Sequence, residues 1–379
     1  MAINFSKSLS TSNLLNAYNN NVVEFSSDNV LDSVKCEIVI NGNSFEISPI
    51  NNVFRFNFKE VVSVLINQNK FVDAVVPSLE LANSDSLIYD DTVNTYLSED
   101  VEYTITFSNE STETTTENYK FLKSVEQLEA YKGGMYSSDK PIYILSPFKE
   151  GTVNTYNLTY NEGYPFDISI YLANIGNLTL LNETNGMSYV FDMQNTINRL
   201  FFSDGRTTIT IADYLPLVNG LNELKLTSGT DVVYLNITKI DSKEGQYIKW
   251  LNEKGGWNYW LFNCVHKRER TTKSLGEVNN DSNDVSETTS PFYSLGRTST
   301  DELILRSNGV EADDKLVLNY LADSPSVYYF TGLRYSQVND VSWVACKFNT
   351  KKTTIINYKK SIANYKFNFT LPQRYTMTL

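Results

Sequence analysis

Apolar and polar residues alternate along much of the chain, a pattern typical of β-strands with one buried face. The alternation is clear in VKCEIVI at residues 34–40 and in DVVYLNITKI at residues 231–240. Asn41 and Gly42 follow the first run, and Asn-Gly readily adopts the positive φ of a hairpin turn. We therefore predict an all-β protein with minor α content, built from two to three β-sandwich-like domains.

Helical patterns are few. One short helix is expected near residues 313–323, because Asp313 or Asp314 can cap its start and Pro325 marks its end. The segment KEVVSVLIN at residues 59–67 fits either a short helix or another strand.

Changes in pattern divide the chain into segments. Residues 1–28 are polar and irregular, so we expect an extended N-terminal arm. Residues 29–122 and 123–241 are expected to form the first and second β-domains, and residues 242–379 a C-terminal β-domain. Within the last, residues 267–297 are polar and poor in apolar side chains, which favours a long projecting loop.

The densest aromatic stretch is QYIKWLNEKGGWNYWLF at residues 246–262. Two apolar runs around a Gly-Gly turn predict a β-hairpin. Large apolar groups stand on both faces, so we expect the hairpin to be buried in a core or a subunit interface. The alternative is an exposed glycan platform that uses Trp257 and Trp260. The residues that define this structural hairpin are Trp250, Gly255, Gly256, Trp257, Tyr259, Trp260 and Phe262.

Length and charge refine this picture. The chain has 379 residues, enough for two or three domains, and a net charge of −12. An acidic surface disfavours binding to nucleic acid or anionic membranes. Residues 341–379 nevertheless contain seven basic and no acidic residues. They form either a solvated strand face or a patch that docks an acidic neighbour, and the candidate subunit-interface residues are Lys351, Lys352, Lys359, Lys360, Lys366 and Arg374.

No catalytic or ligand-binding set is apparent. His266 is the single histidine, and Ser-His-Asp and Cys-His constellations need a histidine with its partners. Cys36, Cys264 and Cys346 are too widely spaced for a zinc site and are expected to be reduced thiols. The run at residues 279–287 offers oxygen ligands for calcium but lacks the EF-hand spacing. We expect no enzyme activity, no cofactor and no metal, although sequence alone leaves open a hydrolase with paired carboxylates.

Targeting signals are also missing from the pattern. The N-terminal residues lack a basic segment followed by an apolar core, so we expect no signal peptide. No apolar run reaches the length that spans a membrane, so we expect no membrane insertion.

The last third of the chain resembles a known group of proteins. WLNEKGGWNYWLF at residues 250–262, SLGR at residues 294–297 and the helix-to-strand run at residues 316–329 carry the resemblance. Together they resemble tail-associated structural proteins of crAss-like and other Bacteroidetes-infecting bacteriophages. The resemblance implies a non-catalytic homo-oligomeric ring or hub protein of the virion tail, assembled in the cytoplasm of the bacterial host. Its implied partners are other copies of itself and neighbouring tail proteins, with genomic DNA passing through without specific binding.

Overall fold

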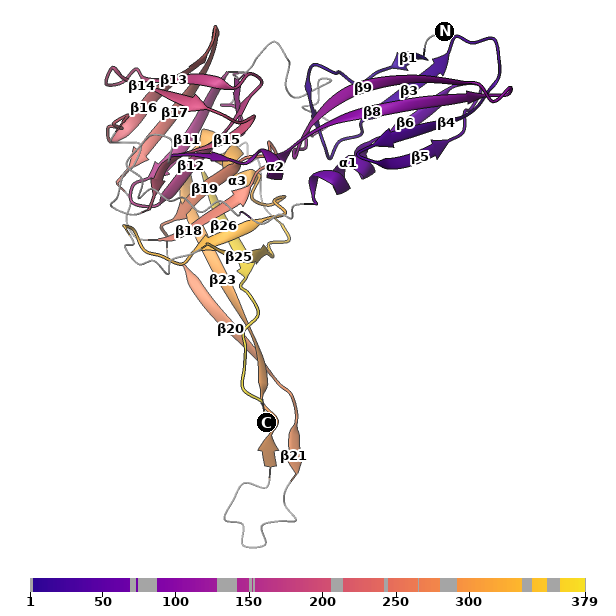
Figure 1. Ribbon diagram of the computed structural model, residues 1–379. Coiled ribbons are helices and arrows are strands. Elements are labelled where there is room, and N and C mark those ends of the chain that lie inside the picture. The colour runs from indigo at the N-terminus through magenta and orange to yellow at the C-terminus, as the bar shows by residue number, and fades with distance from the viewer. Residues whose placement is uncertain are drawn as a thin grey trace.

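A computed structural model of the chain describes residues 3–68, 73, 87–127, 142–149, 152, 154–205, 214–241, 245–264, 266–279, 292–335, 343–352 and 362–378. Strands dominate these residues, which also contain three short helices. Figure 1 shows a first domain at one end, a body of further sheets, and a long two-stranded arm that projects away from the body. The predicted all-β class with several β-sandwich-like domains is confirmed.

The first domain packs a three-stranded sheet, in the order β1-β3-β6, against a five-stranded sheet, in the order β2-β9-β8-β4-β5. Alternation places Ile38 and Tyr103 in the core, where the rings of Phe25 and Phe54 stack with centroids 5.4 Å apart. The segment at residues 59–67 forms a helix that places Val62 and Leu65 in the same core. The elements are β1 (Ile3–Lys7), β2 (Leu14–Asn16), β3 (Val22–Ser27), β4 (Ser33–Ile40), β5 (Asn43–Ile47), β6 (Phe54–Asn57), α1 (Lys59–Ile66), α2 (Thr92–Thr95), β8 (Tyr96–Phe107) and β9 (Thr112–Leu122).

The expected N-terminal arm at residues 1–28 is wrong for the residues described. β1, β2 and β3 are paired strands of the first domain, and Val23 and Phe25 are fully buried. The polar composition misled the prediction because these strands are short and β1 is largely exposed. The first domain therefore begins at β1 and not at residue 29.

The second domain also has two sheets. Their orders are β11-β17-β16-β13-β14 and β10-β12-β15-β7. β7 lies within the predicted first domain, but it pairs with β15 of the second, so the boundary at residue 122 is crossed by an earlier segment. The strands are β7 (Ile88–Asp90), β10 (Ile142–Ile144), β11 (Thr155–Asn161), β12 (Pro165–Leu172), β13 (Gly176–Asn182), β14 (Met187–Met193), β15 (Ile197–Asp204), β16 (Gly220–Ser228) and β17 (Asp231–Ile240).

The C-terminal domain is built on a seven-stranded sheet in the order β19-β18-β24-β25-β26-β23-β20. The predicted helix is present as α3. One continuous apolar core joins this domain to the second domain, so the two pack as one body. The elements are β18 (Gln246–Leu251), β19 (Trp257–Phe262), β20 (Lys267–Ser274), β21 (Glu277–Asn279), β22 (Phe292–Ser294), β23 (Arg297–Val310), α3 (Ala312–Asn319), β24 (Val327–Phe330), β25 (Trp343–Phe348) and β26 (Ala363–Thr370).

The predicted loop at residues 267–297 is instead a regular two-stranded structure in the described residues. β20 pairs with β23 from Lys267 to Ser274, and β21 pairs with β22. We call residues 267–279 and 292–301 the arm (Figure 1). The strands were missed because nearly every side chain of β20 faces water, so the sequence carries no apolar alternation.

Candidate functional site

The aromatic hairpin forms as predicted. β18 and β19 pair in register around the turn, and both faces are covered: Trp250, Trp257, Tyr259 and Phe262 are buried. The glycan-platform alternative therefore does not apply to Trp257. The interpretation of the hairpin as core is confirmed for these residues.

The turn of the hairpin is fitted closely to the neighbouring chain. Gly255 has a φ of +84°, and a Cβ on Gly256 would lie 2.1 Å from the carbonyl oxygen of Leu145. The Asn252 side chain accepts hydrogen bonds from the backbone N–H of Lys254 (2.7 Å) and of Gly256 (3.2 Å). Its amide also donates to the Leu145 carbonyl at 2.9 Å. The glycines are thus required for close backbone approach, and the turn anchors the hairpin to the segment before β11.

Beneath the hairpin lies a buried cluster of charges, which we call the Arg199 cluster. Arg199 on β15 donates to both carboxylate oxygens of Asp167 on β12, at 3.1 and 2.6 Å, and to Asp73 at 2.7 Å. Lys249 on β18 forms an ion pair with Asp73 at 2.5 Å, and Tyr259 on β19 donates to Asp167. The side chains of Arg199 and Asp73 are 1% and 2% exposed.

This arrangement shifts the pKa values of its members. Burial alone raises the pKa of Asp73, but the charges of Arg199 and Lys249 outweigh it and bring the pKa to about 2. Burial lowers the pKa of Lys249 to about 8. The Lys249 ammonium also lies 4.4 Å from the centroid of the Trp343 ring. The cluster links the second domain, the hairpin and the Asp73 segment, and its full enclosure suits a structural role.

Sequence reasoning missed the Arg199 cluster. Sequence reasoning assigned no role to Arg199 or Lys249. A signal was present, because each stands in a run that is apolar on both faces, at residues 197–202 and 247–251. A charged residue in such a run has no solvent face to reach and must find a partner inside.

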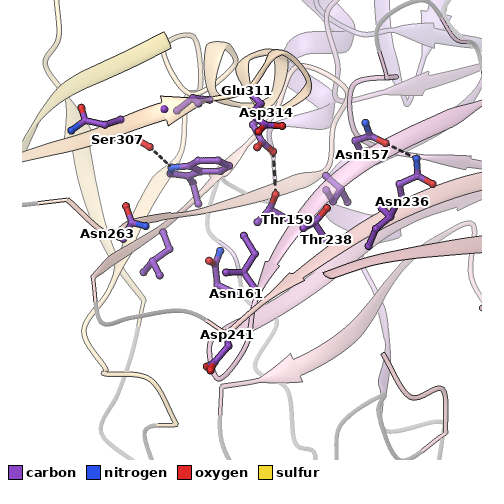
Figure 2. A pocket seen from close by; sticks show the side chains of 18 of the residues that line it. Asn157, Thr159, Asn161, Asn236, Thr238, Asp241, Asn263, Ser307, Glu311 and Asp314 are labelled. Carbon is purple, nitrogen blue, oxygen red and sulfur yellow. Dashed lines mark hydrogen bonds between the residues drawn. The ribbon is translucent and has the colours of Figure 1, made fainter. Parts of the chain in front are cut away.

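Trp260 differs from the rest of its strand, since it alone in β19 is only partly buried. Its indole lines a cleft of about 720 Å³ between the second and C-terminal domains. Figure 2 shows one wall formed by Asn and Thr side chains of β11 and β17, and the other by residues around the junction of β23 and α3. The indole nitrogen donates to the Ser307 hydroxyl at 3.2 Å across the C-terminal wall.

The predicted basic interface residues divide into two sets. Lys351, Lys352, Lys366 and Arg374 are exposed, and none of the four forms an ion pair with another described residue. Lys366 stands beside Arg306 in the pairing of β23 with β26, so positive charge gathers there. Lys359 and Lys360 lie outside the described residues.

The end of the arm carries an unusual concentration of exposed apolar side chains. The C-terminal residues run back along the arm, where Thr378 bridges to Gly296 (Figure 1). Tyr375 and Met377 in this stretch are 94% and 95% exposed. The exposed apolar residues of the arm and this tail, which we call the arm-tip cluster, are Leu275, Val278, Phe292, Tyr293, Leu295, Tyr375 and Met377.

The single histidine, His266, is exposed. Within the described residues, no group of three or more His, Cys, Asp or Glu side chains is arranged to hold a metal ion. None of the described helices is long and apolar enough to cross a membrane. All three cysteines are free thiols.

Comparison with known proteins gives likenesses of fold only. No family model and no curated protein match the chain. Among solved structures, it is similar to the fibronectin(III)-like modules of Clostridium thermocellum CbhA, with a TM-score of 0.19 and 7% identity over 63% of this chain and 95% of that one. It is also similar to a structure that gives insight into how a 1.5-MDa bacterial ice-binding adhesin is retained at the host cell surface. The TM-score is 0.20, with 11% identity over 98% of this chain and 97% of that one. Domains 4 and 5 of the S-layer protein SbsC match with a TM-score of 0.17 and 10% identity over 63% of this chain and 96% of theirs.

Proposed function

We propose that this chain is a non-catalytic structural protein of a bacteriophage virion, which assembles with copies of itself into a ring or hub of the tail around the DNA channel. The observation that supports the proposal most strongly is the arm. In an isolated molecule, this two-stranded hairpin would leave the apolar side chains at its end exposed to water. It suits a protein whose arm is covered by a partner.

The energetic argument concerns the arm-tip cluster. Full burial of a large apolar side chain contributes about 1.5–3 kcal/mol. The strand residues of the cluster are roughly half exposed, so a partner that covers them gains about 1 kcal/mol from each. Exposed apolar groups gathered in this way commonly mark an interaction site.

The distribution of charged residues suggests which surfaces of neighbouring copies meet. Residues 1–122 contain 17 acidic and 6 basic residues, whereas residues 341–379 contain seven basic and no acidic residues. The outer face of β8 carries Asp100 and Glu102, while Lys273 and Arg297 are exposed on the arm. The first domain and the arm lie at opposite ends of the molecule (Figure 1). A contact between the basic C-terminal segment of one copy and the acidic first domain of the next is heterologous, and it closes into a ring when the rotation permits.

The same charge distribution suits a DNA channel. An acidic lumen repels phosphates, so DNA slides past without being held. The proposal assigns the acidic surface of the first domain to this role or to contact with the next arm, and it requires no specific DNA site.

The experiment is a comparison of self-association by analytical ultracentrifugation. In the test variant, Phe292 and Tyr293 are both changed to Ser. In the control, Met187 and Val190 on β14 are changed to Ser, because they match the first pair in exposure (47% and 50%, against 51% and 47%) but lie on the second domain. We expect the full chain and the control to form oligomers and the arm variant to sediment as a monomer. If all three proteins associated equally, the arm would not be needed for assembly, and the main support for this function would be lost.

A further inference from the structure

The cleft beside Trp260 has a wall that differs from the rest of the contact between the same two domains. Elsewhere these domains meet through packed rings, such as Tyr164 with Tyr247 (4.7 Å) and Phe166 with Tyr259 (5.6 Å), and through the fully enclosed Arg199 cluster. Here amides and hydroxyls line an open cleft, and Thr159 donates to the Asp314 carboxylate from one wall to the other at 3.1 Å. A contact that served only to hold the domains together would be expected to enclose its polar groups, as the Arg199 cluster does.

The polar wall is a regular array. β11 and β17 are parallel and in register, so Asn157 stands beside Asn236 and Thr159 beside Thr238. The Asn236 amide donates to the Asn157 side-chain oxygen at 2.9 Å. Such neighbours are about 4.8 Å apart across the strands and about 6.6 Å apart along them. The array therefore offers several donors and acceptors at fixed spacing over one flat face.

The opposite wall supplies an aromatic surface, and the charged residues of the cleft limit which ligands can bind. The indole nitrogen of Trp260 donates a hydrogen bond to Ser307, which holds the ring at the cleft. The cleft is lined by three acidic residues, Glu311, Asp314 and Asp241, and Lys149 is the one basic residue among the described residues of the lining. Asp241 is paired with Arg334 outside the cleft. This balance opposes phosphate and other anions.

We propose that the cleft binds a neutral oligosaccharide. Trp260 packs against the apolar face of a sugar ring, and the Asn157–Asn236 pair and Thr238 hydrogen-bond its hydroxyl groups. The volume of about 720 Å³ lies within the usual range of ligand pockets, about 300–1,000 Å³. The site differs from the glycan platform considered for the hairpin, because Trp257 is buried and takes no part.

The test is isothermal titration calorimetry of the full chain with maltotetraose, cellotetraose, mannotetraose and tetra-N-acetylchitotetraose, each at up to about 10 mM, so that millimolar dissociation constants are detected. Tetragalacturonate serves as the acidic counterpart. At least one neutral tetrasaccharide should bind, and tetragalacturonate should bind more weakly than it. Failure of all four neutral sugars, or a preference for the acidic one, would overturn the proposal.

Variants locate the site. Trp260→Ala should weaken binding at least about tenfold, and Thr238→Val, which removes a hydroxyl and keeps the shape, about three- to tenfold. The matched control is Thr104→Val, on an outward face of the first domain that lies away from the cleft, and it should leave binding unchanged. Circular dichroism checks that each variant is folded. Binding that survives both cleft variants would place it elsewhere and refute the assignment. Because the arm takes no part in the cleft, failure here leaves the assembly proposal intact.

Discussion

Replacement of Arg199 tests whether the buried charge cluster holds the second and C-terminal domains together. Arg199→Met keeps much of the side-chain volume but leaves Asp167 and Asp73 without the guanidinium that binds both. Removing one partner of a buried ion pair typically destabilises a protein by about 3–5 kcal/mol. The loss is large beside a total stability of about 5–15 kcal/mol.

The size of the effect should depend on pH. In the wild type, the pKa of Asp73 is about 2 when folded, below its ordinary value of 3.8, so its stabilising contribution is present above pH 4 and is lost as the pH falls towards 2. The variant lacks one of the two cations that lower this pKa. The difference in stability between wild type and variant should therefore shrink as the pH falls from 7 to 3.

The assay is urea unfolding followed by tryptophan fluorescence. All four tryptophans lie in the C-terminal domain, and the Arg199 guanidinium is 5.6 Å from the Trp257 ring, so the signal reports this body and not the first domain. The control is Lys267→Met, which breaks an exposed pair with Glu269 in the C-terminal domain and should cost less than about 1 kcal/mol. If Arg199→Met shifted the midpoint no more than Lys267→Met does, the cluster would not hold the two domains together.

Three further substitutions test other parts of the structure. Asp73→Asn should remove roughly 2 kcal/mol of the acid dependence of stability between pH 4 and 2, and an unchanged pH profile in urea unfolding would contradict the assigned pKa. Gly256→Ala should lower the free energy of unfolding by about 3 kcal/mol, because its Cβ meets the Leu145 carbonyl oxygen; a melting temperature equal to that of the wild type would count against this close approach. Lys351→Glu combined with Lys352→Glu should block oligomerisation without lowering the melting temperature, and unaltered association in sedimentation would mean that these lysines only face solvent.

Strands with one buried face could be predicted from the sequence, and those without one could not. β4 and β17 alternate because one side enters a core, and the aromatic hairpin is marked by its apolar runs and Gly-Gly turn. β20 has water on both sides, so its residues show no period. Hydrophobic patterning therefore predicts strands that enter a core but does not predict strands that project into solvent.

The candidate sites were less accessible to sequence reasoning for a related reason. The Arg199 cluster and the cleft depend on residues brought together across domains, such as Asp73 with Lys249 and Asn236 with Trp260. No short-range pattern specifies such pairs. The alternation of β17 predicts that Asn236 and Thr238 share an outward face, but only the fold places Trp260 opposite them.

The central claim is that this chain assembles through its arm. Electron microscopy of the purified full chain tests it most directly. The account predicts closed rings in which the arm of each copy lies against its neighbour, with the Phe292→Ser and Tyr293→Ser variant leaving only single particles. A field of monomers from the unaltered chain at micromolar concentration, or rings that the arm variant forms equally well, would contradict it.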